Sequence, residues 1–138
     1  MISALSEIVK EIEDAKTPAK QAKLLKQYSS AALKCIVGYA LDPLVEFQLP
    51  PGTPPYTELE KATDAEGVLH RDYRKLEYLI NSGAGRGVTA IKKEKIFIQL
   101  LESVDPDDAK LLIRVKNKDL NISPKAVKEA WPSVASEW

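Results

Sequence analysis

The sequence predicts an all-α protein, an irregular single-domain bundle of about seven short helices. Apolar residues recur with helical spacing in most segments, and capping residues followed by proline precede several of those segments. No segment shows the sustained alternation of a β-strand. With 138 residues, of which 44% are hydrophobic and 29% charged, the chain has the size and composition of one globular domain. We therefore expect residues 1–138 to fold as a single helical domain.

Three helices are predicted within the first 41 residues. The first covers about 3–15, because positions 5, 8, 9 and 12 are all apolar. Thr17 caps the second, and Pro18 suits its first turn because proline lacks an N–H that would have no partner there. The second helix is expected to end near residue 28. The third follows two serines and ends at residue 41, before an Asp-Pro pair.

Residues 44–56 differ from the segments around them. Apolar residues alternate loosely at the start, and prolines then exclude both a helix interior and a central strand. We expect a stiff, extended loop whose character is set by Pro50, Pro51, Pro54 and Pro55.

Four further helices are predicted after this loop. One covers about 65–81 and ends at a glycine-rich run, 82–87. The next covers about 89–103. Asp105-Pro106 and Ser123-Pro124 each begin another helix in the same way that Thr17-Pro18 does.

The charges are balanced in total but not along the chain. Twenty basic and twenty acidic residues give a net charge of zero, which argues against an indiscriminate grip on nucleic acid. However, residues 16–34 hold five lysines and no acid, whereas residues 42–69 hold six acids and one lysine. Residues 84–128 are basic again, with ten bases and six acids. Two basic segments therefore flank an acidic one, although a solvated surface of mixed charge would have the same composition.

Few residues are suited to catalysis. His70 is the only histidine and Cys35 the only cysteine, so a zinc cluster or an intrachain disulfide is not expected. His70, one helical turn after Glu66, is read as a surface or partly packed residue. Cys35 is read as a small buried hydrophobe rather than a nucleophile. We expect a protein that is not an enzyme and that has no metal or cofactor.

Two segments could contact phosphate groups. The glycine-rich run lacks the Lys-Ser/Thr ending of a nucleotide-binding loop, so it is either a flexible connector or, with Arg86, Lys92 and Lys93, a contact to nucleic-acid backbone. Near the C-terminus, basic and polar residues surround the start of the last helix, whose N–H groups could face an anion. The alternative there is an ordinary capped surface helix. The residues of this second segment are Lys116, Lys118, Asn121, Ser123, Lys125 and Lys128.

Several features together resemble the N-terminal helical domain of the ATP-dependent DNA ligases of T-even bacteriophages. They are the opening Met1-Ile2 with its apolar helix, Gln21-Ala22-x-Leu24-x-Lys26, Leu112-Ile113-Arg114-Val115, Lys118-Asp119-Leu120 and the closing Ala130-Trp131-Pro132. Their order and approximate spacing extend over nearly the whole chain. The chain is also similar to small proteins of T-even-like phages, including cyanophages.

The resemblance implies a helical domain that holds duplex DNA by its sugar-phosphate backbone, without sequence preference. It does not imply ligation, because the Lys-x-Asp-Gly signature of the adenylation domain is absent from this sequence. The family's DNA-contacting turn would fall on residues 118–128. Here the chain departs from the family: the turn is about two residues shorter, and Asn121 stands where a glycine is usual. We expect Asn121 to adopt the left-handed backbone in its place.

Two functions follow from these observations. The first is a stand-alone phage accessory protein that binds duplex DNA through Arg86, Lys92, Lys93, Lys118, Asn121, Ser123, Lys125 and Lys128. The alternative is a module that binds a host or phage protein, with Phe47 and Tyr56 as aromatic anchors on the stiff loop. No apolar run approaches the ~20 residues that span a bilayer, and the N-terminal segment is charged. We therefore expect a cytoplasmic protein, in an infected bacterial host if the resemblance holds, with no membrane or nucleotide partner.

Overall fold

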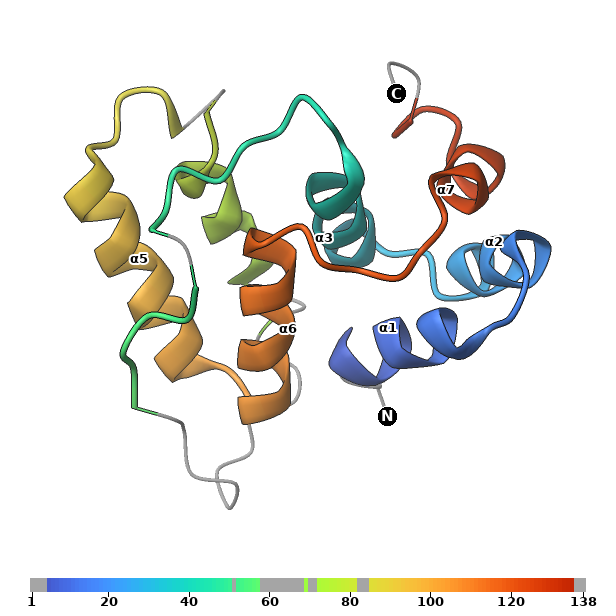
Figure 1. Ribbon diagram of the computed structural model, residues 1–138, viewed down its shortest axis with the longest axis horizontal. Helices are drawn as coiled ribbons and strands as arrows, with labels where there is room; N and C mark the ends of the chain where they lie inside the picture. Colours follow the sequence, from blue (N-terminus) through green and yellow to red (C-terminus); the bar gives the residue numbers. More distant parts are fainter. Residues whose placement is uncertain (1–4, 51, 58–68, 70–71, 82–84, 136–138) are drawn as a thin grey trace.

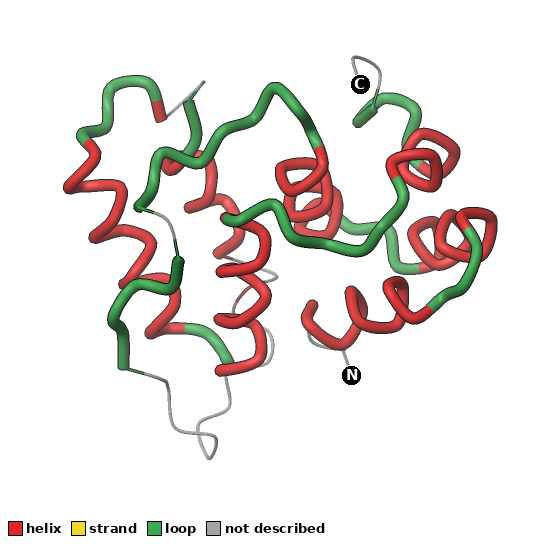
Figure 2. Tube along the Cα trace, in the orientation of Figure 1, coloured by secondary structure: helices red, strands yellow, loops and turns green. Residues whose placement is uncertain are grey.

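The all-α prediction is confirmed by a computed structural model, which describes residues 5–50, 52–57, 69, 72–81 and 85–135. Seven helices lie within these residues (Figure 1). Figure 2 shows no strand among them. The helices are α1 (Leu5–Asp14), α2 (Pro18–Gln27), α3 (Ala31–Leu41), the 3-10 helix η1 (Tyr73–Leu79), α5 (Ala90–Ser103), α6 (Pro106–Lys116) and α7 (Pro124–Ala130).

The helices are arranged in two groups along the longest axis of the molecule. In Figure 1, η1 and α5 form the left end, and α1, α2 and α7 form the right end. Helix α6 lies in the middle and contacts α5, α3 and α1. Helix α2 packs most extensively on α7, although about 100 residues separate them in the sequence. The right end is therefore built from both termini of the described chain.

The predicted helix starts are confirmed at four positions. The hydroxyl of Thr17 accepts a hydrogen bond from the backbone N–H of Lys20, and Ser30 and Thr89 cap α3 and α5 in the same way. Asp105 accepts from the N–H of Asp107 at the start of α6. Each cap satisfies an N–H that has no partner inside the helix. Ser123 precedes α7 as predicted, but its side chain makes no capping bond.

A single apolar core joins the elements. The stripe predicted for α1 is buried in full, at Leu5, Ile8, Val9 and Ile12. The core continues through the inward faces of α3, α5 and α6 and closes at Trp131, which is 5% exposed. The chain beyond α7 packs on α3. Val134 lies so close to Gly38 that a Cβ atom added to this glycine would be 3.3 Å from Cγ1 of Val134.

Within the helix predicted over 65–81, Leu69 and Asp72 are α-helical, and Tyr73–Leu79 forms the 3-10 helix η1. Residues 65–68 and 70–71 lie outside the described residues. After η1 the backbone is extended, because residues 79–81 pair with residues 46–48. Gln48 donates to Leu79 O at 2.9 Å, and Asn81 donates to Glu46 O at 3.0 Å. This isolated antiparallel bridge ends the helix earlier than the apolar pattern indicates.

The proline-rich loop is extended, as predicted, and it crosses the face of α5 and α6 (Figure 1). Phe47 anchors its first part in the core, where its ring meets the edge of Tyr39 at a centroid distance of 6.2 Å. Phe47 is only 9% exposed. The loop is thus a packed element rather than a projecting one.

Candidate nucleic-acid interface

The turn from α6 to α7 begins with a left-handed residue, but that residue is Lys118 and not Asn121. Lys118 has a φ of 57°, and it is the one described residue other than glycine with a positive φ. Its N–H donates to Val115 O at 2.9 Å, and the next N–H, of Asp119, donates to Arg114 O at 2.8 Å. This pair of bonds is the Schellman ending of a helix, in which the left-handed position follows the helix cap directly. The prediction for Asn121 was therefore wrong, because the helix ending and not the later turn requires this conformation.

The backbone of the turn is held by two side chains from the N-terminal helices. The N–H of Asn121 donates to Oε2 of Glu13 at 2.7 Å, and the N–H of Ser123 donates to Oε1 of Gln21 at 2.9 Å. Gln21 also donates its amide N–H to Asn121 O at 3.1 Å. Pro124 has no N–H to offer. The N–H groups of Asn121 and Ser123 in the predicted turn are thus bound within the protein.

Glu13 is held in turn by a bidentate ion pair with Arg114. The guanidinium donates to Oε1 at 2.9 Å and to Oε2 at 2.6 Å. Burial alone would raise the pKa of Glu13, but the hydrogen bonds from Arg114 and from the Asn121 N–H, with the attraction of the guanidinium charge, outweigh it. The pKa of Glu13 is therefore lowered. The carboxylate stays charged and fixes α1, α6 and the turn to one another.

Two of the predicted DNA-contacting lysines point inward. Lys93 is 1% exposed, and its amino group donates to Gln48 Oε1 and, at 3.1 Å, to Ile80 O. The amino group of Lys118 donates to the carbonyl oxygens of Asp42 and Val45. Burial lowers the pKa of Lys118, although nearby acids oppose the change. Gln48 and Ile80 engage the ammonium group of Lys93, and the carbonyls of residues 42 and 45 engage that of Lys118, so neither group is presented to a partner.

The exposed predicted cations lie at opposite ends of the molecule. Arg86 and Lys92 are exposed near the start of α5, at the left end in Figure 1. Lys125 and Lys128 are exposed on α7, at the right end. The predicted residues therefore do not form one continuous site.

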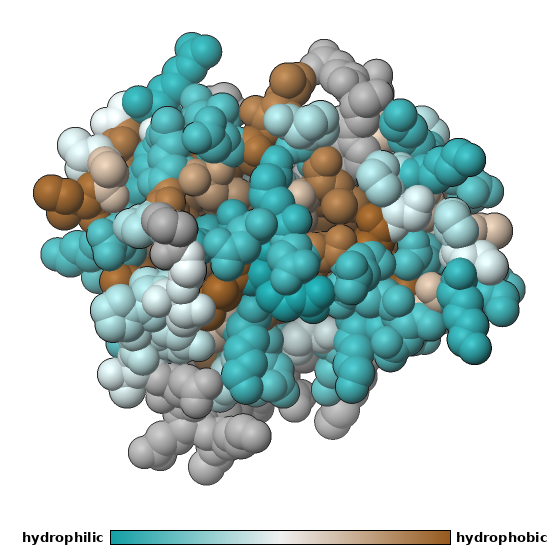
Figure 3. Space-filling model, in the orientation of Figure 1, coloured by the Kyte–Doolittle hydropathy of each residue, from teal (hydrophilic) through white to brown (hydrophobic). Residues whose placement is uncertain are grey.

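Helix α2 and the turn before it add four exposed lysines to the right end. Because α2 and α7 pack against each other, their outer faces form one basic surface, which we call the α2–α7 surface. In Figure 3, hydrophilic residues cover most of this end of the molecule. Within the described part of the chain, none of its lysines makes an ion pair, and Glu129 is the only acid on the two helices. The lysines of the α2–α7 surface are Lys16, which precedes α2, with Lys20, Lys23, Lys26, Lys125 and Lys128.

A shallow hollow lies where this surface meets the turn. Its volume is about 420 Å³, and Lys16, Thr17, Asn121 and Ser123 are among the residues that line it. The hollow brings two residues of the predicted turn beside the first lysine of the basic segment. Residues 16–26 were missed as site residues, although their lysine content without any acid was a signal that could have identified them.

The two aromatic anchors of the alternative function differ in burial. Phe47 is a core residue, and Tyr56 is half-buried and packs against the same core. A protein partner could reach Phe47 only if the loop left its place. The structure therefore excludes Phe47 as an exposed anchor, whereas Tyr56 stays a prediction.

The residues considered for catalysis form no reactive group where they are described. His70 and Glu66 lie outside the described residues. Burial raises the pKa of Cys35 to about 11, so its thiol is protonated at neutral pH and is a poor nucleophile. Within the described residues, no three His, Cys, Asp or Glu side chains gather in a way that could hold a metal ion. No described helix is long and apolar enough to cross a membrane.

Comparison with known proteins gives a family but not an activity. The profile of a family of unknown function, DUF6433, matches residues 8–122. The chain belongs to this family. The matched DUF6433 region includes the Glu13–Arg114 pair and the lysines that bind the loop, and it ends just before α7. No curated protein and no solved structure matches the chain.

Proposed function

We propose that this protein binds double-stranded DNA through the sugar-phosphate backbone, without sequence preference and without catalysing a reaction, as an accessory protein of a bacteriophage. The observation that carries the proposal is the α2–α7 surface. Helices α2 and α7, which are far apart in the sequence, pack together and, with Lys16, expose six lysines that make no ion pair within the described residues. A protein of zero net charge thereby has one locally basic surface, because Glu129 is the only acid on α2 and α7.

The chemistry of this surface suits phosphate contacts. Each lysine that neutralises a phosphate releases condensed counterions, which is the main source of affinity for non-specific complexes. Lysine is a flexible point charge, so it contacts phosphates without requiring a particular base. Binding of this kind depends weakly on sequence and strongly on salt.

The choice of duplex DNA among polyanions rests on the resemblance to the phage ligase domain. In that family the contacting turn corresponds to residues 118–128. Here Glu13 and Gln21 occupy the N–H groups of Asn121 and Ser123. The proposal therefore assigns the contact to the lysines of α2 and α7 that flank the turn. Arg86 and Lys92, at the other end, are not part of it.

Fluorescence anisotropy with a labelled nicked duplex, an intact duplex and a single strand tests this function. We expect both duplexes to bind at low salt, and a second duplex of unrelated sequence to bind equally well. Affinity should fall steeply between low and moderate salt. Binding that does not change with salt, or no binding to any duplex at low salt, would contradict the proposal.

A further inference from the structure

The buried charge of Lys116 has no counter-ion among the described residues. Lys116 is 7% exposed, and its amino group donates to Pro50 O and to Gly52 O, each at 2.7 Å. No described carboxylate pairs with it. Burial lowers the pKa of Lys116. An ammonium group has three N–H donors, so one donor remains after the two carbonyls are satisfied.

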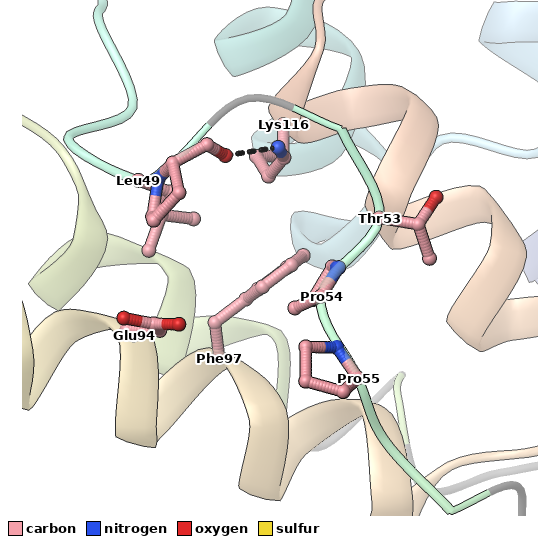
Figure 4. A pocket seen from close by; sticks show the side chains of 8 residues that line it. Leu49, Thr53, Pro54, Pro55, Glu94, Phe97 and Lys116 are labelled. Atoms are coloured by element: carbon pink, nitrogen blue, oxygen red, sulfur yellow. Dashed lines mark hydrogen bonds between the residues drawn. The ribbon is translucent and has the colours of Figure 1, made fainter.

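Lys116 lines a cavity beneath the proline-rich loop (Figure 4). The cavity has a volume of about 200 Å³, and apolar groups form most of its wall. The loop supplies Leu49, Pro54 and Pro55, and the Phe97 ring of α5 projects between them toward Lys116. The site therefore combines a mostly apolar wall with one buried cation, Lys116, and one carboxylate, Glu94.

We infer that this cavity binds a small molecule with an apolar body and a single carboxylate. The remaining N–H of Lys116 would donate to the carboxylate, which would supply the counter-ion that the protein lacks. A cavity of about 150 Å³ is enough to hold a benzene ring. The larger volume here accommodates a ring or a branched chain with a short acidic arm, packed against Phe97 and Pro54.

Glu94 limits the charge of the ligand. It is partly buried and lines the same cavity from α5, opposite the loop. A second anionic group on the ligand would lie near this carboxylate and be repelled. The inferred ligand therefore carries one negative charge. This site is separate from the α2–α7 surface, so its test does not depend on DNA binding.

The experiment compares phenylacetate with its uncharged isostere phenylacetamide, by ligand-observed NMR and titration calorimetry. We expect saturable binding of phenylacetate that is at least about tenfold tighter than that of the amide, as a charge-assisted hydrogen bond would give. Titration with phenylmalonate, which adds a second carboxylate, should give weaker binding than phenylacetate. Lys116→Met should remove the preference for the acid over the amide.

Two loop variants keep the inference testable if the Lys116 variant does not fold. Pro55 lines the cavity but is exposed, and its ring faces Phe97 (Figure 4), so Pro55→Trp should block the cavity without disturbing the core. Thr57→Trp adds the same side chain just after the loop and outside the cavity, and it should bind phenylacetate like the unaltered protein. No saturable binding, equal binding of acid and amide, or binding that survives Pro55→Trp would overturn the inference.

Discussion

Three lysines donate hydrogen bonds to one segment and hold it against the helices. Lys93, Lys116 and Lys118 reach the chain between residues 42 and 52 from α5, from α6 and from the turn that follows α6. A proline-rich segment cannot satisfy its carbonyl groups by forming regular structure, and buried carbonyls need donors. Lys116 and Lys118 supply donors to these carbonyls, and Lys93 donates to the side chain of Gln48, so all three act as structural residues.

The sequence indicates that two of these lysines are buried, although their charge would suggest that they are exposed. Lys93 lies four residues before Phe97, on the apolar stripe of α5, and Lys116 lies four residues after Leu112, on the stripe of α6. A lysine on an apolar stripe is buried with its helix. Its partner could not be predicted, because the oxygens come from a loop about 45 to 66 residues away.

Gly85 is required by a close approach of two backbone segments. A Cβ at this position would come 2.1 Å from Ile80 O, the same oxygen that accepts from Lys93. We expect Gly85→Ala to lower the free energy of unfolding by about 1–3 kcal/mol, the usual cost of forcing atoms into a packed site. Urea denaturation measures the change.

Gly87→Ala is the matched control. No atom lies within 4 Å of a Cβ built at Gly87, so this change should be neutral or slightly stabilising. Equal destabilisation by both substitutions would show that the approach to Ile80 is not the cause.

The Glu13–Arg114 pair should make stability depend on pH. Because folding lowers the pKa of Glu13 below 4.5, the stabilisation is present above that pH and is lost as the pH falls through the folded-state pKa. Glu13→Gln should cost about 1–2 kcal/mol at pH 7 and progressively less in acid. Urea denaturation at several pH values measures this. Glu7→Gln, on the exposed side of α1, should have little effect. A loss for Glu13→Gln that is the same at every pH would contradict the role of the charge.

At the scale of elements, the helices were predictable because each start is encoded locally. Thr17, Thr89 and Asp105 form the capping bonds that their positions before a helix predict. The end of η1 was not predictable, because a bridge to Phe47, 33 residues earlier in the chain, sets it. Local pattern thus determines where the helices begin, whereas long-range pairing determines how the middle segment ends.

The end of α6 offers a test at this scale. Lys118 occupies a left-handed position that glycine fills without strain, and its side chain also binds the loop. Lys118→Ala removes the side-chain bonds and keeps the strain, whereas Lys118→Gly removes both. We expect the glycine variant to be more stable than the alanine variant by about 1 kcal/mol, measured by thermal and urea denaturation. The reverse order would show that the backbone at Lys118 is not strained.

At the scale of the whole molecule, six exposed lysines gather on the α2–α7 surface. The sequence shows that residues 16–34 are rich in lysine. It does not show that this segment lies beside α7, because that depends on the packing of α2 on a helix about 100 residues away. In the same fold, Arg86 and Lys92 lie far from Lys125 and Lys128, although all four residues were predicted to belong to one DNA-binding site. The candidate site is therefore half predicted: α7 and its lysines were identified, and the α2 partner was not.

The most direct test of the proposed function compares duplex affinity after removal of equal charge from each end. One variant carries Lys20→Gln, Lys23→Gln and Lys125→Gln on the α2–α7 surface. Its control carries Arg86→Gln, Lys92→Gln and Lys95→Gln, all exposed residues near the start of α5 or within it.

Both variants have the same net charge, so only the location of the substituted residues differs. Fluorescence anisotropy over a salt series should show weaker binding for the α2–α7 variant, with a salt dependence reduced by about 0.9 for each phosphate that is no longer neutralised. The control should bind almost like the unaltered protein. Equal weakening of both variants, or a greater weakening in the control, would contradict the assignment of DNA binding to the α2–α7 surface.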